Sequence, residues 1–211
     1  MTTETRPLAP PLESGDRLTR AEFERRYRKN PEIKKAELIE GVVYVASPVR
    51  ITRHAQPNLW VDTWLGTYLS RNPGVIGGTN GTVRLDADNE PQPDAFLAWD
   101  VAHGGRARLD EDDYLAGPPD LVVEIAASSA AYDLHDKLEV YRRNGVREYV
   151  VWQILEERID WFSLRAGLYI PNVPDTLGVA HSEVFPGLRL DVPAMLAGNI
   201  HAVLAELGDV R

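Results

Sequence analysis

The segment of residues 119–152 constrains the fold of this chain more than any other stretch. Residues 121–126 form an apolar, β-branched run interrupted only by Glu124, which favours a buried strand over a helix. Apolar residues then recur at helical spacing over residues 134–141, and residues 149–152 again have the composition of a buried strand. A strand–helix–strand unit of this kind normally builds a parallel or mixed sheet with the helix packed on one face.

Two serines and a lysine are the notable polar residues around the helix of this unit. Ser128 and Ser129 can cap its start, because a hydroxyl there accepts a hydrogen bond from a free backbone N–H group. Lys137 follows Asp133 by four residues and precedes Tyr141 by four. Residues at this spacing lie on one face of a helix, so the three side chains are expected on the same face.

The length of 211 residues is enough for one well-packed domain and short for two. We expect a single domain over residues 18–211, preceded by a flexible N-terminal arm of residues 1–17. The arm is rich in proline and lacks the charged-then-apolar order of a signal peptide. No apolar run approaches the length that a membrane span needs.

Charge and cysteine content exclude several classes of function. The chain has no cysteine, which excludes disulfides, thiolate zinc sites and a cysteine nucleophile, and together with the absence of a signal peptide favours the cytoplasm. The net charge of −9 argues against a protein that coats nucleic acid non-specifically, because such binding relies on a basic surface. A local basic groove, or an acidic site neutralised by a metal ion, remains compatible with this charge.

Three elements are expected before residue 72. Thr19 and Glu22 have the spacing of a capping box and predict a short helix. Residues 36–45 contain two β-rich runs around a Glu-Gly pair, which predicts a hairpin with Glu37 on its first strand. Residues 52–71 carry apolar residues on one helical face and predict a longer helix.

The remaining elements give a chain with a mostly β centre and few helices. Residues 82–85 and 93–99 flank a turn-rich segment and predict a second hairpin, with Asp94 near the start of its return strand. Residues 106–117 are polar and acidic and are expected to form a surface excursion. A late hairpin over residues 159–170 and a terminal helix starting at residues 191–193 complete the pattern. The fold class is therefore α/β or α+β.

Asp94 and Glu124 are the strongest candidates for chemistry. Each lies at a predicted strand beside apolar residues, on segments that can neighbour each other in one sheet. Two poorly solvated carboxylates repel each other unless one is protonated or a cation lies between them. Oxygen ligands without cysteine indicate a hard cation, Mg²⁺ or Mn²⁺. Lys137, on the following helix, can orient an attacking water or offset charge that develops on a phosphate.

Short polar motifs are spread along the whole chain. They are Glu37-Leu38-Ile39-Glu40-Gly41, Ser47-Pro48, His54, Pro93-Asp94, Pro119-Asp120 with Glu124, Tyr132-Asp133, Lys137, Tyr141-Arg142, Gly145-Val146 before Glu148-Tyr149, and Phe185-Pro186-Gly187-Leu188. Together they resemble the Uma-two family of bacterial endonucleases, within the restriction-endonuclease-like PD-(D/E)XK superfamily, over roughly residues 18–195. The resemblance implies a restriction-endonuclease-like core, a central mixed β-sheet flanked by helices.

The resemblance also implies roles for individual residues. It makes Asp94 the metal-binding aspartate and Glu124 the second acidic ligand. The lysine that the superfamily usually has two residues after this glutamate is replaced by Ala126, and the resemblance implies that Lys137 takes its role. Glu37 would be an accessory acid near the metal.

The same resemblance implies the substrate and the accessory contacts. His54, expected in the first turn of the helix over residues 52–71, would contact the substrate. DNA is the substrate and Mg²⁺ (or Mn²⁺) the cofactor that the resemblance implies, and a homodimer is compatible with a fold that often cuts two strands.

Other interpretations of these residues and of the whole chain stay open at this point. Glu124 could pair with Arg142 or Arg147, Lys137 could be a solvated helix residue, and His54 could lie on the surface. The protein could also be a nuclease-like scaffold that binds a protein or nucleic acid without cutting it, or a hydrolase of a smaller phosphoester.

Overall fold

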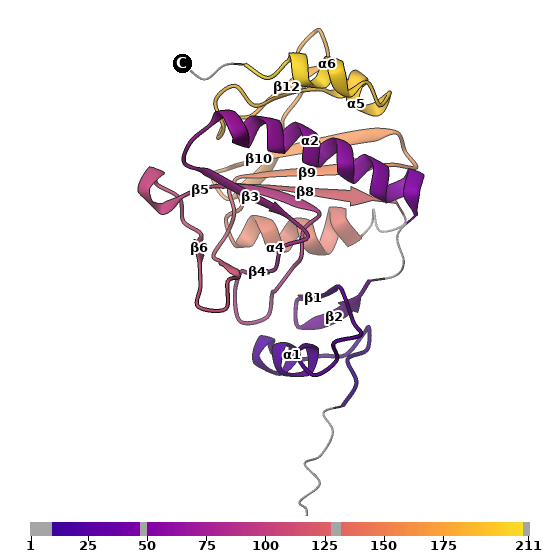
Figure 1. Ribbon diagram of the computed structural model, residues 1–211, viewed down its shortest axis with the longest axis vertical. Coiled ribbons are helices and arrows are strands. Elements are labelled where there is room, and N and C mark those ends of the chain that lie inside the picture. The colour runs from indigo at the N-terminus through magenta and orange to yellow at the C-terminus, as the bar shows by residue number, and fades with distance from the viewer. Residues whose placement is uncertain (1–9, 47–49, 128–131, 209–211) are drawn as a thin grey trace, which may run out of the picture.

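A computed structural model describes residues 10–46, 50–127 and 132–208. Its centre is a mixed six-stranded sheet with the strand order β11-β10-β9-β8-β5-β3 (Figure 1). The strands are β3 (Val75–Thr79), β5 (Ala95–Trp99), β8 (Leu121–Ala126), β9 (Glu148–Gln153), β10 (Arg158–Arg165) and β11 (Leu168–Pro171). Within this sheet only the β8–β9 pair is parallel. The predicted strand–helix–strand unit is therefore confirmed as the middle of the sheet.

Helices cover both faces of the central sheet (Figure 1). On one face lie α2 (Gln56–Arg71), α5 (Val192–Leu196) and α6 (Ile200–Ala205), and on the other lie η3 (Asp133–Lys137) and α4 (Leu138–Arg143). Strands β8 and β9 are buried along their whole length, because side chains of both their faces pack against a helical layer. This double burial explains why the two strands are nearly continuous apolar runs in the sequence.

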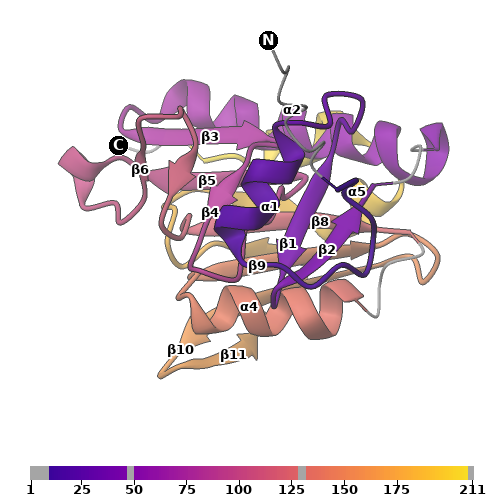
Figure 2. The same cartoon turned by 90° about the horizontal axis from the view of Figure 1, so that it is seen from below.

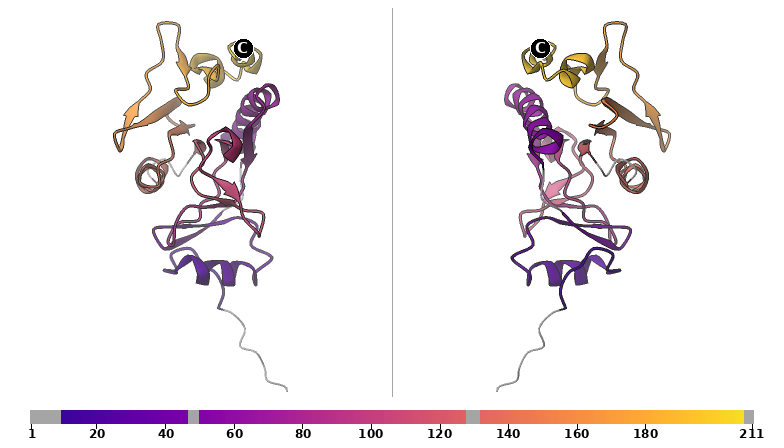
Figure 3. Two further views of the ribbon diagram at one scale, coloured as in Figure 1. Left: turned by 90° about the vertical axis from the view of Figure 1, so that its left-hand side faces the viewer. Right: turned by 90° about the vertical axis from the view of Figure 1, so that its right-hand side faces the viewer.

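An N-terminal lobe lies on the same side of the sheet as α4, opposite α5 and α6 (Figures 1 and 3). It consists of α1 (Arg20–Tyr27), β1 (Ala36–Ile39) and β2 (Val42–Val45) around a small core of its own. The predicted capping at Thr19 is confirmed, since its Oγ1 accepts the Glu22 N–H at 3.4 Å. The lobe joins the body of the protein through an antiparallel bridge between Leu38 and Glu90, and Figure 2 shows α1 and the hairpin in front of the sheet, next to α4.

The predicted N-terminal arm is shorter than expected. Leu12 is buried in the core of the N-terminal lobe, the Ser14 hydroxyl accepts a hydrogen bond from Val45 N, and Arg17 bridges to Val42. Residues 12–17 thus pack on the β1–β2 hairpin through the buried Leu12 and through backbone hydrogen bonds such as Gly15 N to Val43 O. Residues 1–9 of the arm and the predicted capping pair Ser128 and Ser129 lie outside the described residues.

The second predicted hairpin is wrong. Strand β5 pairs with β3 and β8, and β4 (Val83–Arg84) pairs in parallel with β7 (Leu115–Ala116). The chain does fold back after β4, since Val83 N donates to Pro91 O at 2.9 Å. The return limb ends there because Pro91 and Pro93 have no N–H group to continue a ladder.

Two further expectations are corrected. The predicted surface excursion over residues 106–117 contains β6 (Arg108–Leu109) and β7, which form a small sheet with β4. Ala107 and Leu115 are buried there, so only part of the segment faces solvent. The terminal helix is two short helices, α5 and α6, which break at Gly198, where the backbone has φ +70°.

The other short elements are η1 (Ile51–Ala55), which leads without a break into α2, η2 (Val101–His103), and the pair β12 (Val179–His181) and β13 (Arg189–Asp191). None of the helices in the described part of the chain combines the length and the apolar character that crossing a membrane requires.

Candidate active site

Strand register brings Asp94 and Glu124 together. Strands β5 and β8 are antiparallel with Ala95 opposite Val123, so one step further along the same register places Asp94 opposite Glu124. Directly opposed residues point to the same face of a sheet. The backbone N–H of Ile125 also donates to Asp94 Oδ2 at 2.9 Å. The two predicted metal ligands therefore share one end of the β5–β8 pair, and both side chains are 4% exposed.

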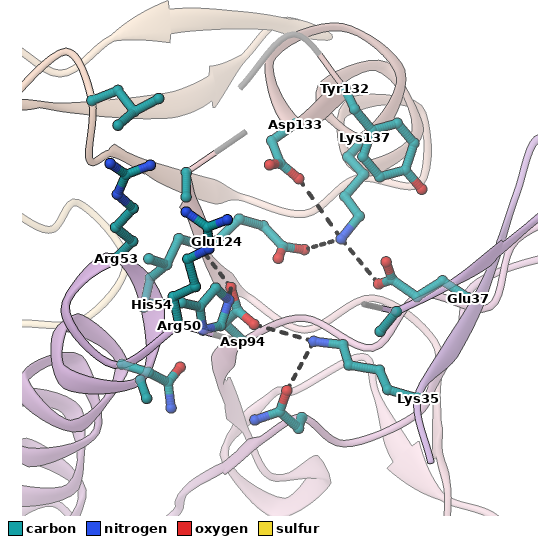
Figure 4. Close-up of a pocket in the computed structure, with 17 residues that line it drawn as sticks. Lys35, Glu37, Arg50, Arg53, His54, Asp94, Glu124, Tyr132, Asp133 and Lys137 are labelled. Atoms are coloured by element: carbon teal, nitrogen blue, oxygen red, sulfur yellow. Dashed lines mark hydrogen bonds and ion pairs between the residues drawn. The ribbon is translucent and has the colours of Figure 1, made fainter. Parts of the chain in front are cut away.

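Cationic and polar groups surround the Asp94 carboxylate (Figure 4). Lys35 Nζ lies 3.1 Å from Oδ1 and also donates to Asn80 Oδ1 at 2.8 Å. His54 Nε2 lies 3.3 Å from Oδ2. Burial acts to raise the pKa of Asp94, but the hydrogen bond with His54, the charge of Lys35 and the Ile125 N–H outweigh it and lower the pKa below its usual range. Asp94 is accordingly a carboxylate.

Lys137 joins two acids from distant parts of the chain. Its Nζ lies 2.9 Å from Glu124 Oε1 and 2.9 Å from Glu37 Oε1, with Asp133 Oδ1 at 3.8 Å. The Tyr141 hydroxyl donates to the same Glu124 oxygen at 2.9 Å. The predicted common face of Asp133, Lys137 and Tyr141 is confirmed, and it is turned towards the end of β8.

The arginine pairing considered for Glu124 does not occur. Arg142 pairs with Glu139, and Arg147 lies 3.3 Å from Asp120. Lys137 is not a solvated helix residue either, because it is 3% exposed. Lys137, and not an arginine, is the ion-pair partner of Glu124.

Electrostatics in this cluster favour a protonated lysine among crowded acids. Burial acts to lower the pKa of Lys137, but the charges of Glu124, Glu37 and Asp133 outweigh it and raise the pKa well above its ordinary value. Burial raises the pKa of Glu124, and the neighbouring charges of Asp94 and Glu37 raise it further, against the lowering effect of Lys137. The cluster around Lys137 thus contains three acidic side chains, Glu37, Glu124 and Asp133, and one ammonium group.

Glu37 reaches the cluster because of the way in which the N-terminal lobe docks. Leu38, the next residue on β1, forms the bridge to Glu90, and Glu37 Oε1 accepts the backbone N–H of Gln92 at 2.7 Å as well as the bond from Lys137. This carboxylate therefore holds Lys137 in position and fastens the lobe to the segment that leads into Asp94.

One cavity of about 750 Å³ is lined by all five predicted site residues. They are Glu37, His54, Asp94, Glu124 and Lys137. The cavity is also lined by Lys35, Arg50 and Arg53, which the sequence interpretation missed. A signal for the arginines was present, because two arginines at the start of a helix are unusual.

The donor set fits a hard cation that keeps part of its shell for water and substrate. Within the described ranges, no cluster of three or more His, Cys, Asp or Glu side chains is placed to hold a metal ion. Two carboxylates are nevertheless the usual protein contribution to a Mg²⁺ site in enzymes of phosphate chemistry. The hydrogen bonds that Lys137 and Tyr141 donate to Glu124 both reach Oε1, so among the described residues Oε2 is left as an unused acceptor.

Comparison with known proteins supports the fold and identifies the family. The chain is similar to a crystal structure of a "putative nuclease" from Anabaena variabilis, with a TM-score of 0.58 and 12% sequence identity over 77% of this chain and 89% of the other. At that identity the likeness shows the fold, which is the restriction-endonuclease-like mixed α+β architecture expected from the sequence. The search of curated proteins found no match. The family model Uma2, described as "putative restriction endonuclease", matches residues 20–193, and the chain therefore belongs to this family.

Proposed function

We propose that this protein is a metal-dependent endonuclease that hydrolyses phosphodiester bonds in DNA. The observation that carries the proposal is the convergence of Asp94, Glu124 and Lys137 on one cavity. Lys137 supplies from a helix the ammonium that the superfamily usually places on the strand, where this chain has Ala126. The chain thus lacks the lysine two residues after Glu124, but Lys137 brings an ammonium group to the same glutamate from another element. This replacement argues against a non-catalytic scaffold that has lost its active site.

Asp94 and Glu124 would hold Mg²⁺ or Mn²⁺. A cation bound there supplies Lewis-acid stabilisation of charge on the phosphate and makes water more acidic at neutral pH. The protein contributes a site whose two carboxylates are fixed in advance, Asp94 by Lys35 and Ile125 N, and Glu124 through its Oε1.

Lys137 would act as a fixed positive charge. Because its pKa is raised, its ammonium is a donor and not a base, and it can orient a water or offset the negative charge that grows on a phosphate oxygen. Glu37 positions Lys137 from the opposite side. His54, held at Asp94 Oδ2, lies on the cavity wall where it can contact substrate.

The test combines metal binding with cleavage. We expect Asp94→Asn and Glu124→Gln to abolish Mn²⁺ binding, measured by calorimetry with a phosphorothioate oligonucleotide present to complete the coordination. Both should lower cleavage of a random-sequence DNA pool on the order of 100-fold or more. Lys137→Met should retain Mn²⁺ binding but lose cleavage, provided that circular dichroism shows a folded variant.

Two exposed acids provide matched controls. Asp136 lies on the helix of Lys137 and Glu156 lies in the turn after β9, and both residues are exposed. Asp136→Asn and Glu156→Gln should therefore change neither Mn²⁺ binding nor DNA cleavage. Unchanged cleavage in Asp94→Asn would refute the proposal. If a small chromogenic phosphodiester were cleaved as well as DNA, the substrate would be a smaller phosphoester.

A further inference from the structure

The helix that forms one wall of the cavity begins with cationic residues. Element η1 continues into α2, so the helix runs over residues 51–71 with Arg50 at its N-cap. Arg53 and His54 follow in its first turn, which contains no acidic residue. A helix N-terminus carries partial positive charge and unpaired N–H groups and normally favours acids. This sequence does the opposite, at a cost in local stability.

The protein itself does not compensate for that cost. The Arg50 carbonyl accepts the backbone N–H groups of His54 and Ala55, but the side chains of Arg50 and Arg53 make no hydrogen bond or ion pair with the described residues, and both residues are exposed. His54 does have a partner, Asp94, at 3.3 Å. Violations of local preference without internal compensation are typical of functional sites, and here they indicate an anionic ligand that comes from outside the chain.

The two arginines lie on the cavity wall across from the lysines. Both line the cavity that holds Asp94 and Glu124, and Figure 4 shows them rising from the end of the helix on one side of these acids, with Lys35 and Lys137 on the other side. The carboxylates of Asp94 and Glu124 can bind a cation, whereas Arg50 and Arg53 can bind an anion next to it. Arginine has a planar fork of donors that matches phosphate oxygens in a bidentate way.

We propose that Arg50, Arg53 and the first turn of the helix form a subsite for backbone phosphates of a nucleic-acid strand, next to the phosphate that is cleaved. This inference rests on the proposed function. The net charge of −9 means that the protein as a whole repels a polyanion, so capture of the strand depends on this wall more than it would in a basic nuclease. Arg50 at the N-cap and Arg53 in the first turn lie at the same end of the helix, and both line the cavity.

The experiment measures binding without cleavage. Fluorescence anisotropy of a labelled single-stranded oligonucleotide in EDTA compares the wild type with Arg50→Gln, Arg53→Gln and the double variant over a range of salt concentrations. We expect the double variant to bind at least tenfold more weakly. Its slope of log affinity against log salt should be shallower by about 1.4, the value for two phosphate contacts on a single strand.

Arg71→Gln is the matched control. Arg71 is exposed at the other end of the same helix, where a cation favours the helix. Its removal should leave oligonucleotide binding unchanged and slightly lower the unfolding midpoint. Arg50→Gln and Arg53→Gln should leave that midpoint unchanged or raise it, because they remove like charge from a helix N-terminus. If the arginines had a purely structural role, Arg50→Gln and Arg53→Gln would lower the unfolding midpoint and leave oligonucleotide binding unchanged.

Failure of this inference differs from failure of the proposed function. If the wild type binds and cleaves nucleic acid but the double variant matches it in affinity and salt slope, the phosphate subsite is refuted and the nuclease remains. If a mononucleotide competes as well as the oligonucleotide, the wall holds a single phosphate and the strand assignment is wrong. A wild type that neither binds nor cleaves any oligonucleotide, with or without Mn²⁺, overturns both proposals.

Discussion

Lys34 and Lys35 are adjacent in the sequence and have opposite surroundings. The Lys34 side chain is exposed, and its Nζ donates to Pro31 O at 2.8 Å. The Lys35 ammonium lies 3.1 Å from Asp94 Oδ1 inside the cavity. Burial lowers the pKa of Lys35, but Asp94, Glu37 and Glu124 raise it overall. Lys35 is thus a resident cation at the position of a proposed metal ligand.

Lys35→Met should increase the affinity for Mn²⁺. The substitution removes a positive charge that repels the incoming ion and frees one oxygen of Asp94, which at short range and intermediate dielectric is worth about tenfold or more. Calorimetric titration of the variant measures the effect. Lys34→Met is the control and should bind Mn²⁺ like the wild type. Weaker binding in Lys35→Met alone would instead mean that Lys35 positions Asp94 for the metal.

At the residue scale, the acids were more predictable than the cations. Asp94 and Glu124 stand out in the sequence because a carboxylate beside a buried strand is costly unless it has a partner. Lys35 gives no such signal, since a lysine before a strand is normally solvated. Its position follows from the docking of the N-terminal lobe, a contact between segments 59 residues apart, which local patterns do not encode.

Two glycines show how element geometry decides the effect of one methyl group. Gly41 follows Glu40 in the β1–β2 turn, and both have positive φ, +69° and +52°, as a tight hairpin turn requires. A Cβ at Gly41 would also lie 3.3 Å from Leu18 O. Gly66 is in the middle of α2 with ordinary helical geometry, and a Cβ there would meet nothing within 4 Å.

The two glycine-to-alanine variants should change stability in opposite directions. Gly66→Ala should stabilise by about 0.5–1 kcal/mol, because alanine loses less conformational freedom in a helix. Gly41→Ala should destabilise by about 1 kcal/mol or more, because φ is positive and the space is tight. Urea unfolding of both variants against the wild type tests the pair. A Gly41→Ala variant as stable as the wild type would show that the turn rearranges freely.

At the element scale, sequence patterns predicted isolated elements better than their partners. The strand–helix–strand unit, the first hairpin and the long helix follow from local periodicity, which is strong in each. Strand β3 was not predicted, because glycine is unfavourable in strands and its Gly77-Gly78 pair weakens the strand pattern. Without β3, the segment of β4 was wrongly predicted as the partner of β5.

Buried carboxyl groups also make the stability of the whole molecule depend on pH. Glu148, at the start of β9, is completely buried and accepts hydrogen bonds from Ser182 Oγ at 2.6 Å and Glu183 N at 2.7 Å. Burial raises its pKa from 4.5 to about 7, although these two hydrogen bonds act to lower it. Between these values the folded state holds a proton that the unfolded state has lost, so stability declines as pH rises.

Glu148→Gln should remove this part of the pH dependence. In the wild type the contribution of Glu148 is fully present below pH 4.5 and is lost as pH rises through 7, a change of about 3 kcal/mol in the free energy of unfolding. The difference in the free energy of unfolding between the wild type and Glu148→Gln should therefore become smaller or change sign from pH 4.5 to pH 8. Urea unfolding at each pH measures this difference. Glu156→Gln, at an exposed position, should follow the wild type at every pH, and a Glu148→Gln curve parallel to both would rule out the effect.

The ion-pair cluster also has a consequence for how the protein is made. Lys137 contacts Glu37 across 100 residues of chain, and Glu124 lies on β8, which is framed by β5 on one side and by β9 on the other. A ribosome delivers Glu37 and Asp94 long before Lys137 and β9 emerge. A chain that ended between residues 125 and 136 would carry both proposed metal ligands without Lys137 and without β9, which hold them in register. Translation products that end before residue 137 would therefore lack the complete proposed site, which requires the chain at least to the end of β9.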